Sequence, residues 1–361
     1  MKAHGVDPPW PRRRTRPVEV GGVVVGGGEP IPVQTMTKTD PLDVAATVAQ
    51  IREVSAAGAS IVRLAIPHRA AVEAFREIRQ QVSVPLVADI HFDDRLALAA
   101  LDAGADKIRI NPGNIGDDSK LGAVVEAAAS RGVPIRVGVN SGSLEPGVLD
   151  KYGGPTAEAA AASALANVTR LERMGFHDIV VSIKASDIWR TVQANRRFAA
   201  ESDYPLHLGV TEAGPGETGI ISAAAGLGIM LAEGIGDTIR VSLTDPPLTE
   251  VRVGCETLVA MGLRSGPRLI SCPTCGRCRS DLQSLARAVQ EELRSIEAPV
   301  VVAVMGCEVN GPGEAREADV GLAAGQDQAV LFRHGQRLRV VPITEALSAL
   351  MEEVRQLAGP A

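Results

Sequence analysis

Aromatic residues are scarce in this chain, which has five phenylalanines, two tryptophans and two tyrosines among 361 residues. Proteins that bind single-stranded nucleic acid use aromatic side chains as stacking platforms, so this composition argues against that class. The formal net charge of −6 also argues against nonspecific binding to nucleic-acid phosphates. With so few rings, the core must be built from valine, isoleucine, leucine and alanine.

Targeting and membrane signals are also lacking. The basic residues Arg12, Arg13 and Arg14 have no apolar segment behind them, so they do not resemble a secretory signal. The apolar run over residues 298–305 is too short to cross a bilayer. Five cysteines are too few, and odd in number, for a disulfide framework. We therefore expect a soluble cytoplasmic protein that contacts no membrane and uses its cysteines for metal or redox chemistry.

From residue 31 onward the chain repeats short β-rich runs, each followed by an alanine-rich stretch with helical period. This alternation predicts right-handed βα units around a parallel sheet. The number of units favours an α/β fold of the (β/α)₈ TIM-barrel type, with an open sheet as the alternative. Valines and glycines over residues 18–28 predict a small hairpin at the bottom of the barrel. The β-rich runs cover residues 31–36, 61–66, 86–90, 107–110, 135–139, 178–184, 206–210 and 238–243.

The pattern changes near Gly266 and Pro267, a pair typical of turns, and the cysteines cluster beyond it. Five short β-rich runs and two helical stretches follow. We therefore predict a first domain over residues 1–265, comprising the hairpin and the barrel. A smaller α/β domain that carries the cysteines is predicted over residues 266–361.

Polar side chains recur on the predicted barrel strands, although parallel strands are normally buried on both faces. Active sites of such barrels form at the C-terminal ends of the strands. Five cations on five strands favour a phosphate- or diphosphate-bearing ligand over structural pairing with carboxylates. Glu212, the acid among them, is either a counter-charge or a proton donor. The cations are Arg63, Arg109, Arg136, Lys184 and Arg240, and Asp89, His91, Asn111, Asn140, Thr211 and Ser242 lie at or just beyond strand ends.

The second domain carries Cys272, Cys275 and Cys278 in a C-x-x-C-x-x-C run, and Cys307 follows further on. Zinc is disfavoured because neither a second C-x-x-C pair nor a histidine at finger spacing is present. The ferredoxin-like spacing favours an iron–sulfur cluster on these four thiolates, which would serve simple electron transfer. The alternative replaces Cys278 with the carboxylate of Glu314, a ligand that is easier to displace from iron.

Six motifs stand in the chain in a particular order: PVQTMTKTD at 32–40, VADIHF at 87–92, RINPGNIG at 109–116, HLGVTEAG at 207–214, CPTCGR at 272–277 and NGPGE at 310–314. In this order they resemble the 4-hydroxy-3-methylbut-2-en-1-yl diphosphate synthase family of the non-mevalonate isoprenoid pathway. The resemblance covers nearly the whole chain. Thr35 stands where the family often has serine, and Lys38, where it often has asparagine, adds a positive charge near the barrel mouth.

The resemblance implies an oxidoreductase that converts 2-C-methyl-D-erythritol 2,4-cyclodiphosphate to 4-hydroxy-3-methylbut-2-en-1-yl diphosphate by reductive ring opening and loss of a hydroxyl. It implies a [4Fe–4S] cluster on Cys272, Cys275, Cys307 and Glu314, which reverses the preference given by spacing. Flavodoxin or ferredoxin would supply the electrons. Glu212 and Glu314 would be the catalytic residues.

The resemblance also implies a homodimer in which the cluster domain of one chain covers the barrel mouth of the other. Two further hypotheses remain: an electron-transfer protein with an all-cysteine cluster, and a barrel enzyme that condenses a pterin diphosphate and carries structural zinc. The cyclic diphosphate of the first hypothesis would be bound by Arg63, Arg109, Asn111, Arg136, Asn140, Lys184, Thr211, Arg240 and Ser242.

Overall fold

The structure is a computed structural model that describes residues 11–91, 93–111, 115, 117–307 and 317–359. The chain divides into two compact units, of which the first ends at Met261 and the second begins at Gly262. The boundary predicted after residue 265 therefore falls just inside the second unit. In the described part of the chain, no helix has the length and apolar character needed to span a membrane.

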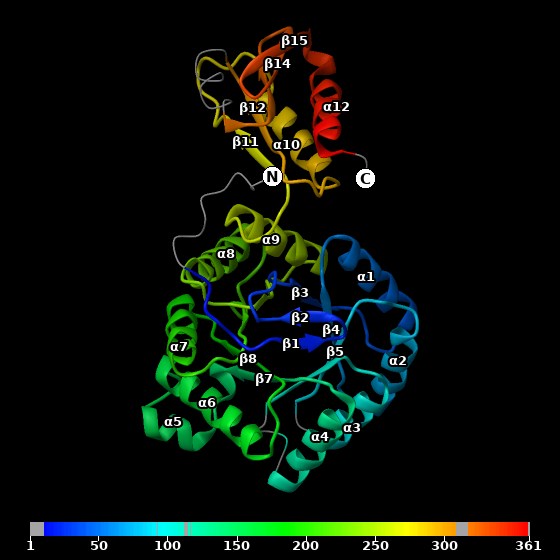
Figure 1. Cartoon of the computed structure of the whole chain (residues 1–361), viewed down its shortest axis with the longest axis vertical. Coiled ribbons are helices and arrows are strands. Elements are labelled where there is room, and N and C mark those ends of the chain that lie inside the picture. The colour runs from blue at the N-terminus through cyan, green and yellow to red at the C-terminus, as the bar shows by residue number, and fades with distance from the viewer. Residues whose placement is uncertain (1–10, 92, 112–114, 116, 308–316, 360–361) are drawn as a thin grey trace. The chain divides into compact units, whose positions relative to one another are not determined.

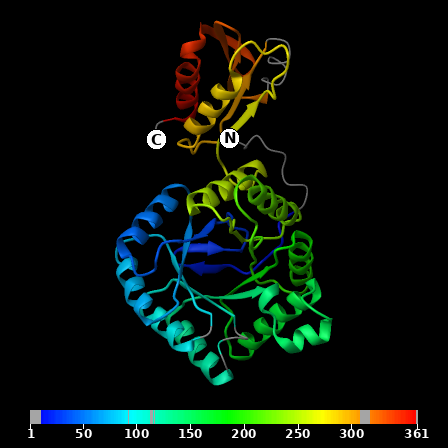
Figure 2. The same ribbon diagram turned by 180° about the vertical axis from the view of Figure 1, so that it is seen from behind.

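In the first unit, strands alternate with helices that surround them on the outside (Figures 1 and 2). The short helix α5 (Pro146–Tyr152), between β7 and α6, is an element that the sequence did not predict. The alternating elements are β3 (Gln34–Met36), α1 (Val44–Ala56), β4 (Ile61–Ala65), α2 (Arg69–Arg79), β5 (Leu86–Asp89), α3 (Asp94–Asp102), β6 (Lys107–Ile110), α4 (Asp118–Arg131), β7 (Ile135–Asn140), α6 (Ala157–Arg173), β8 (Ile179–Lys184), α7 (Ile188–Glu201), β9 (His207–Leu208), α8 (Gly216–Ala232), β10 (Thr238–Ile239) and α9 (Pro247–Ala260).

Strand pairing closes this unit into a barrel. Strands β3 to β8 form one parallel sheet, and β9 pairs with β10 in parallel. Parallel bridges between Val181 and Leu206 and between Val33 and Ile239 join the two sheets at both edges. The strand order therefore returns from β10 to β3, which confirms the predicted TIM barrel over the open sheet. Strands β9 and β10 are shorter than the predicted runs, at two residues each.

Local sequence explains where the barrel helices begin. The side chains of Asp43, Asp93, Asp117 and Asp187 each accept a hydrogen bond from a backbone N–H in the first turn of the helix that follows. Such caps satisfy donors that a helix leaves unpaired at its start. Gly132 ends α4 in the left-handed conformation, with φ of +62°, that glycine adopts without strain.

The valine-rich hairpin closes the N-terminal end of the barrel. Strands β1 (Val18–Val20) and β2 (Val23–Val25) pair antiparallel. Val18, Val20 and Val25 pack in one buried cluster with side chains from β4, β5 and β8. These barrel partners are Ile61, Val87 and Val180, which sit near the starts of their strands. The hairpin predicted to close the bottom of the barrel is therefore confirmed.

Strand register sorts the inward-facing residues into layers of four, supplied by alternate strands as is usual in such barrels. The hairpin cluster fixes which face points inward, because it contains residues of the two lowest layers. From the hairpin upward, the layers are Ile61, Lys107, Val180 and Thr238; Gln34, Val87, Arg136 and His207; Arg63, Arg109, Ser182 and Arg240; Met36, Asp89, Gly138 and Gly209; Ala65, Asn111, Lys184 and Ser242.

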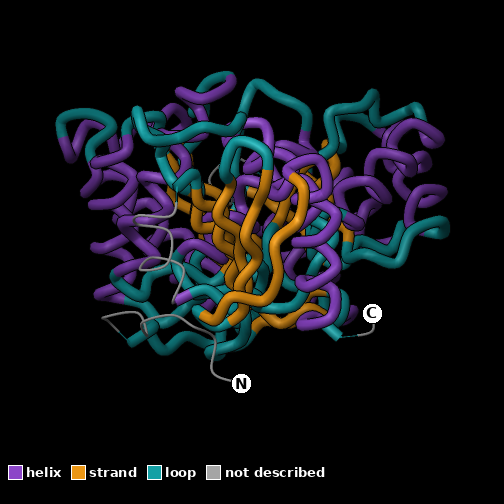
Figure 3. The backbone as a smooth tube through the Cα atoms, turned by 90° about the horizontal axis from the view of Figure 1, so that it is seen from above, coloured by secondary structure: helices purple, strands orange, loops and turns teal. Residues whose placement is uncertain are grey.

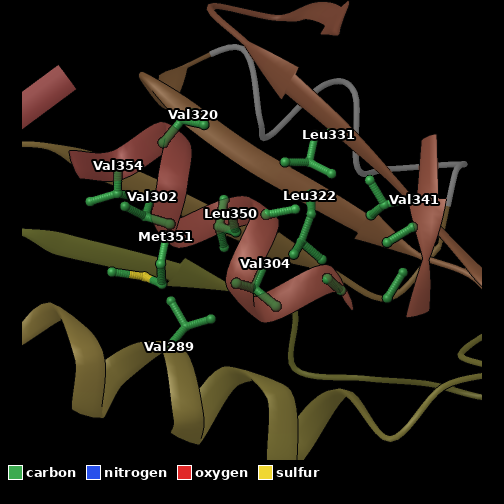
Figure 4. Close-up of a cluster of buried hydrophobic side chains, with 14 of the residues drawn as sticks. Val289, Val302, Val304, Val320, Leu322, Leu331, Val341, Leu350, Met351 and Val354 are labelled. Carbon is green, nitrogen blue, oxygen red and sulfur yellow. The ribbon is translucent and has the colours of Figure 1, made fainter. Parts of the chain in front are cut away.

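The second unit is a five-stranded sheet with two helices. The strand order is β11 (Arg268–Ser271), β12 (Val301–Met305), β13 (Val320–Ala324), β14 (Gln328–Arg333) and β15 (Gln336–Pro342), and the last two strands run antiparallel to their neighbours. Helices α10 (Leu282–Leu293) and α12 (Ala346–Ala358) pack on one face, where Val289 and Leu350 meet Val302, Val304 and Leu322 (Figure 4). Figure 3 traces the backbone with helices in purple and strands in orange.

A half-buried and a buried aspartate that each precede a strand hydrogen-bond to the neighbouring strand. Asp106 accepts a 2.8 Å hydrogen bond from the N–H of Leu86, and Asp237 accepts one of 2.8 Å from Leu206. Asp237 also accepts 2.8 Å from Thr15 Oγ1 and lies 3.8 Å from the guanidinium of Arg13. It therefore joins the N-terminal segment to the barrel bottom.

We expect Asp237→Ala to lower the free energy of unfolding by about 2–3 kcal/mol, because it removes the acceptor of the Leu206 N–H and the Thr15 hydroxyl and the negative charge beside the partly buried Arg13. Urea denaturation of the apo-protein measures this. Asp203→Ala is the control: Asp203 pairs with Arg16 at an exposed site, and its loss should cost less than about 1 kcal/mol. Equal losses in the two variants would contradict the role given to Asp237.

Candidate anion-binding pocket and cysteine loops

The five predicted cations converge inside the barrel, in the second, third and fifth layers above the hairpin. Arg63 Nη2 lies 3.5 Å from Asp89 Oδ2, and Arg109 Nη1 lies 3.4 Å from Asp89 Oδ1. Arg136 and Lys184 are fully buried and interact electrostatically with both of these arginines and with Arg240. Side chains that are far apart in the sequence therefore form one cationic cluster.

Burial and mutual repulsion disfavour the charged forms of these cations. Burial, then the neighbouring cations, holds the pKa of Arg136 and of Lys184 well below their ordinary values. Burial and Arg63 lower the pKa of Arg240 to about 10, although Glu250 opposes them. Burial raises the pKa of Asp89, but Arg63, His91 and Arg109 together hold it well below its usual range. A bound anion would relieve this repulsion, so the cluster is a candidate polyanion site.

Two glycines of the fourth layer make room for the cationic groups. A Cβ atom on Gly138 would lie 2.4 Å from Arg109 Nε. A Cβ atom on Gly209 would lie 2.5 Å from the carbonyl oxygen of Arg240 and 2.7 Å from Lys184 Nζ. The absence of side chains at this level lets Arg109 reach upward and Lys184 reach downward into one space.

The uncharged residues predicted for the site lie above this cluster, at the C-terminal ends of the strands. Asn111 is buried just after β6, and Asn140 is half-buried at the end of β7. Thr211 and Ser242 are half-buried after β9 and β10. Glu212 is exposed and has φ of +55°, a left-handed conformation that costs energy in a non-glycine residue and clusters at functional sites.

Glu250 is a site residue that the sequence reasoning missed. It is 2% exposed in α9, where its carboxylate lies 2.9 Å from Lys38 Nζ and 3.9 Å from Arg240 Nη2. It also accepts hydrogen bonds from Thr35 Oγ1 at 3.2 Å and from the N–H of Leu243 at 3.0 Å. Glu250 therefore offsets the charge of Lys38. A glutamate in the first turn of a helix is usually exposed. The sequence alone therefore does not show that Glu250 is buried and paired with a cation.

The ion pairs of Asp89 predict a pH dependence of stability. Because its folded pKa lies below its unfolded value of about 3.9, the carboxylate stabilises the fold above about pH 4. This contribution is lost as the pH falls toward the folded pKa. We expect Asp89→Asn to lower the free energy of unfolding by about 3 kcal/mol at pH 7 and to flatten the decline on acidification.

Urea titrations of the apo-protein between pH 3 and pH 7 test this expectation. Asp102→Asn is the matched control, since Asp102 pairs with Arg131 on the surface, where its side chain is 58% exposed. The control should follow the wild-type pH profile. An unchanged acid slope in Asp89→Asn would contradict the assigned ion pairs.

The cysteine-bearing segments follow two neighbouring strands of the second sheet. Cys272 follows β11, and its N–H donates to the carbonyl of Val304 in β12 at 3.0 Å. Cys307 follows β12, and Cys275 is exposed in the loop between Cys272 and Cys278. Since β11 and β12 are parallel neighbours, both cysteine-bearing segments begin at the C-terminal ends of strands on the same side of the sheet.

Cys278 differs from the other cysteines of its loop. Its thiol donates to the carbonyl of Ser280 at 3.4 Å, whereas its packing against the core formed by the sheet and α10 is shared with Cys272. A Cβ atom on Gly306 would lie 2.8 Å from its Sγ. Glu314 lies outside the described residues. The described residues hold no group of three histidine, cysteine or acidic side chains gathered as a metal site, but their free thiols are the donors that iron–sulfur clusters use.

A closed barrel with a buried cluster of cations, followed by a separate cysteine-bearing unit, defines a two-unit TIM-barrel protein of the α/β class. The family model of the GcpE TIM-barrel domain matches residues 15–255, and that of the GcpE protein C-terminal domain matches residues 268–356. The chain belongs to the GcpE family.

Curated relatives match along almost the whole chain. A protein of Thermodesulfovibrio yellowstonii is 49% identical over 346 residues, which are 96% of this chain and 99% of the relative. A protein of Geobacter sulfurreducens is 53% identical over 347 residues, covering 96% and 98% of the two chains. Both are named 4-hydroxy-3-methylbut-2-en-1-yl diphosphate synthase (flavodoxin).

Among solved structures, the Plasmodium falciparum HPPK-DHPS protein with pterin and p-hydroxybenzoate aligns with a TM-score of 0.51 at 11% sequence identity. The alignment covers 69% of this chain and 48% of that one. At this identity the likeness shows the barrel fold alone, and it gives no support to the pterin-condensing alternative.

Proposed function

We propose that this chain is an iron–sulfur oxidoreductase that converts 2-C-methyl-D-erythritol 2,4-cyclodiphosphate to 4-hydroxy-3-methylbut-2-en-1-yl diphosphate in the non-mevalonate pathway. The observation that carries the proposal is the match, at about half identity over nearly the full length, to proteins named for this activity. Reductive ring opening and loss of a hydroxyl require electrons from outside. Flavodoxin is the donor in the names of these relatives, and ferredoxin is the alternative.

The barrel cluster would bind the cyclic diphosphate. In the described structure, Arg63 and Arg109 pair with Asp89, and Arg240 pairs with Glu250. The buried cations outnumber these two carboxylates, which leaves an excess of positive charge for a dianion to balance. Arginine and lysine would also neutralise charge on the departing phosphate oxygen. The proposed substrate contacts are Arg63, Arg109, Asn111, Arg136, Asn140, Lys184, Thr211, Arg240 and Ser242.

Glu212 would hold a proton for the oxygen that leaves. Its place after β9 puts it at the end of the barrel where the strands end, and its backbone has the left-handed conformation that clusters at functional sites. A carboxylic acid in such a position can protonate a leaving oxygen.

We assign the cofactor as a [4Fe–4S] cluster held by Cys272, Cys275, Cys307 and Glu314. The hydrogen bond from the Cys278 thiol to the carbonyl of Ser280 supports leaving Cys278 outside the set. When bound, such a cluster supplies one-electron transfer. The carboxylate of Glu314 would be the ligand that yields most readily, since it binds iron more weakly than thiolate. The free thiols fit a reducing compartment, the cytoplasm.

The direct test is an anaerobic assay of the reconstituted protein with the cyclic diphosphate and a strong one-electron reductant, followed by the same assay with reduced flavodoxin. We expect the open-chain diphosphate as product in both. A protein with a full complement of iron and sulfide that forms no product would refute the proposal.

The proposed homodimer would place the cluster domain of one chain over the barrel mouth of its partner. Subunit mixing tests this arrangement. Arg109→Met removes a substrate contact in the barrel, and Cys307→Ala removes a ligand of the cluster. Each variant alone should therefore be inactive. A mixture of the two should recover about a quarter to a half of the activity if the site is shared between chains. A mixture without activity would contradict the shared site.

A further inference from the structure

The two lowest layers of the barrel interior are polar, although they lie deep in the protein beneath the candidate substrate pocket. Gln34, Lys107, Arg136 and His207 are each no more than 1% exposed. The hairpin cluster with Val18, Val20 and Val25 closes these layers from below. The third layer, with Arg63, Arg109 and Arg240, lies directly above them, and Arg136 of the second layer is itself one of the proposed substrate contacts.

These side chains present polar atoms that no described residue satisfies. Lys107 Nζ, Arg136 Nε and Nη1, both ring nitrogens of His207, and Oε1 and Nε2 of Gln34 all lack a hydrogen-bond partner in the described structure. Buried polar groups in proteins are nearly always hydrogen-bonded, so atoms gathered in this way point to a further ligand. Ammonium, guanidinium and amide nitrogens only donate, so Lys107 Nζ, the two Arg136 nitrogens and Gln34 Nε2 lack an acceptor, whereas Gln34 Oε1 lacks a donor and the ring of His207 can do either.

The charge of the two layers specifies the kind of acceptor. Their other members are Ile61, Val180, Thr238 and Val87, so the layers contain cations but no carboxylate. The nearest acids are engaged elsewhere: Asp89 pairs with Arg63 and Arg109, and Glu250 pairs with Lys38. Cations buried without a counter-charge are costly, whereas a bound anion would both neutralise them and accept their hydrogen bonds.

We propose that the lower barrel holds a resident inorganic anion of halide size, bound between Lys107, Arg136 and His207. A monoatomic anion suits a barrel whose interior is already filled by side chains, and it accepts hydrogen bonds from several directions at once. This ion would be separate from the substrate. It would keep Arg136 charged from below while the upper part of the barrel takes the diphosphate.

The titration behaviour of the same groups agrees with this site. Burial, then the charges of Arg136 and Arg63, holds the pKa of Lys107 well below its ordinary value. Burial and the nearby Lys184, Arg136 and Lys107 hold the pKa of His207 well below its ordinary value. An anion among them opposes each of these effects and lets Lys107 keep its proton.

Anomalous diffraction gives the first test. Full-length protein is unfolded in urea, refolded in sodium bromide and crystallised in the same salt, because a sealed site exchanges only when the barrel opens. We expect a bromide peak within hydrogen-bond distance of Lys107 Nζ and His207. The absence of that peak in an ordered barrel would overturn the proposal and leave water as the occupant.

Urea unfolding of the apo-protein gives the second test, with sodium chloride compared with sodium gluconate at equal ionic strength. We expect chloride to raise the unfolding midpoint of the wild type, and Lys107→Met to abolish the difference. The control is Lys151→Met, which removes an exposed lysine of α5 and should keep the chloride effect. Equal midpoints in the two salts for the wild type would overturn the proposal. If Lys107→Met does not fold, the bromide experiment on the wild type still decides.

Discussion

Gly209→Ala should lower kcat/KM for the cyclic diphosphate by at least about 100-fold while the barrel stays folded. The new Cβ atom would stand 2.5 Å from the carbonyl oxygen of Arg240 and 2.7 Å from Lys184 Nζ, both too close for any real contact. The first of these atoms belongs to the backbone, so β9 and the segment after β10 must move apart. A shift of about 1 Å in substrate-binding groups is enough to cost about 100-fold in rate.

The loss is measured as kcat/KM in the anaerobic assay, with circular dichroism to show that the fold persists. Gly228→Ala is the matched control, because a Cβ at Gly228 in α8 would meet no atom within 4 Å. This control should keep full activity and gain about 0.5–1 kcal/mol of stability from its helical position. Wild-type activity in Gly209→Ala would show that Lys184 and Arg240 do not bind substrate as proposed.

The barrel was predictable because its signals are local and repeated. Each β-rich run and the helical stretch after it can be recognised within about 30 residues, and residues such as Gly132 mark helix ends. The hairpin was equally local, since its valines alternate before a cluster of glycines. Helix α5 was missed because it is a single short element within a longer connection. The strands and helices of the second unit were predictable for the same reason, because their sequence signals are also local.

Only part of the candidate site could be predicted from the sequence. A cation on a parallel strand stands out from its apolar neighbours, so Arg109 and Arg136 could be found without a structure. Glu250 and Gly209 could not, because their roles depend on which strands and helices face one another across the barrel. Only strand register shows that Gly209 shares a layer with Asp89, or that Lys107 and His207 lie beneath the pocket.

Cysteine spacing is ambiguous for a similar reason. A C-x-x-C-x-x-C run gives the distance between thiols along the chain but not the direction in which each thiol points. The structure turns Cys278 toward the core beside Leu282 and Gly306, while Cys275 is exposed. This difference is the basis of the second large effect that we expect.

Cys307→Ala should lose the cluster and at least about 100-fold of the reductase activity, whereas Cys278→Ala should keep both. Removing a thiolate ligand leaves an iron without its donor, and metal affinity falls steeply. Removing the Cys278 thiol only shortens a packed side chain, so its cost falls on stability at about 1–2 kcal/mol. Iron and sulfide content after anaerobic reconstitution, the cluster's visible absorbance and turnover measure the two outcomes.

Glu314→Ala completes this comparison, because it separates the reductase from an electron carrier with four thiolate ligands. A cluster that uses Glu314 should become labile or change its spectrum in Glu314→Ala, and Glu314→Asp should restore part of the wild-type signal by returning a carboxylate. An all-cysteine cluster would show the opposite pattern, with Cys278→Ala losing iron and Glu314→Ala unchanged. That opposite pattern would refute the assigned ligand set. It would also remove the carboxylate ligand that is proposed to yield most readily from iron.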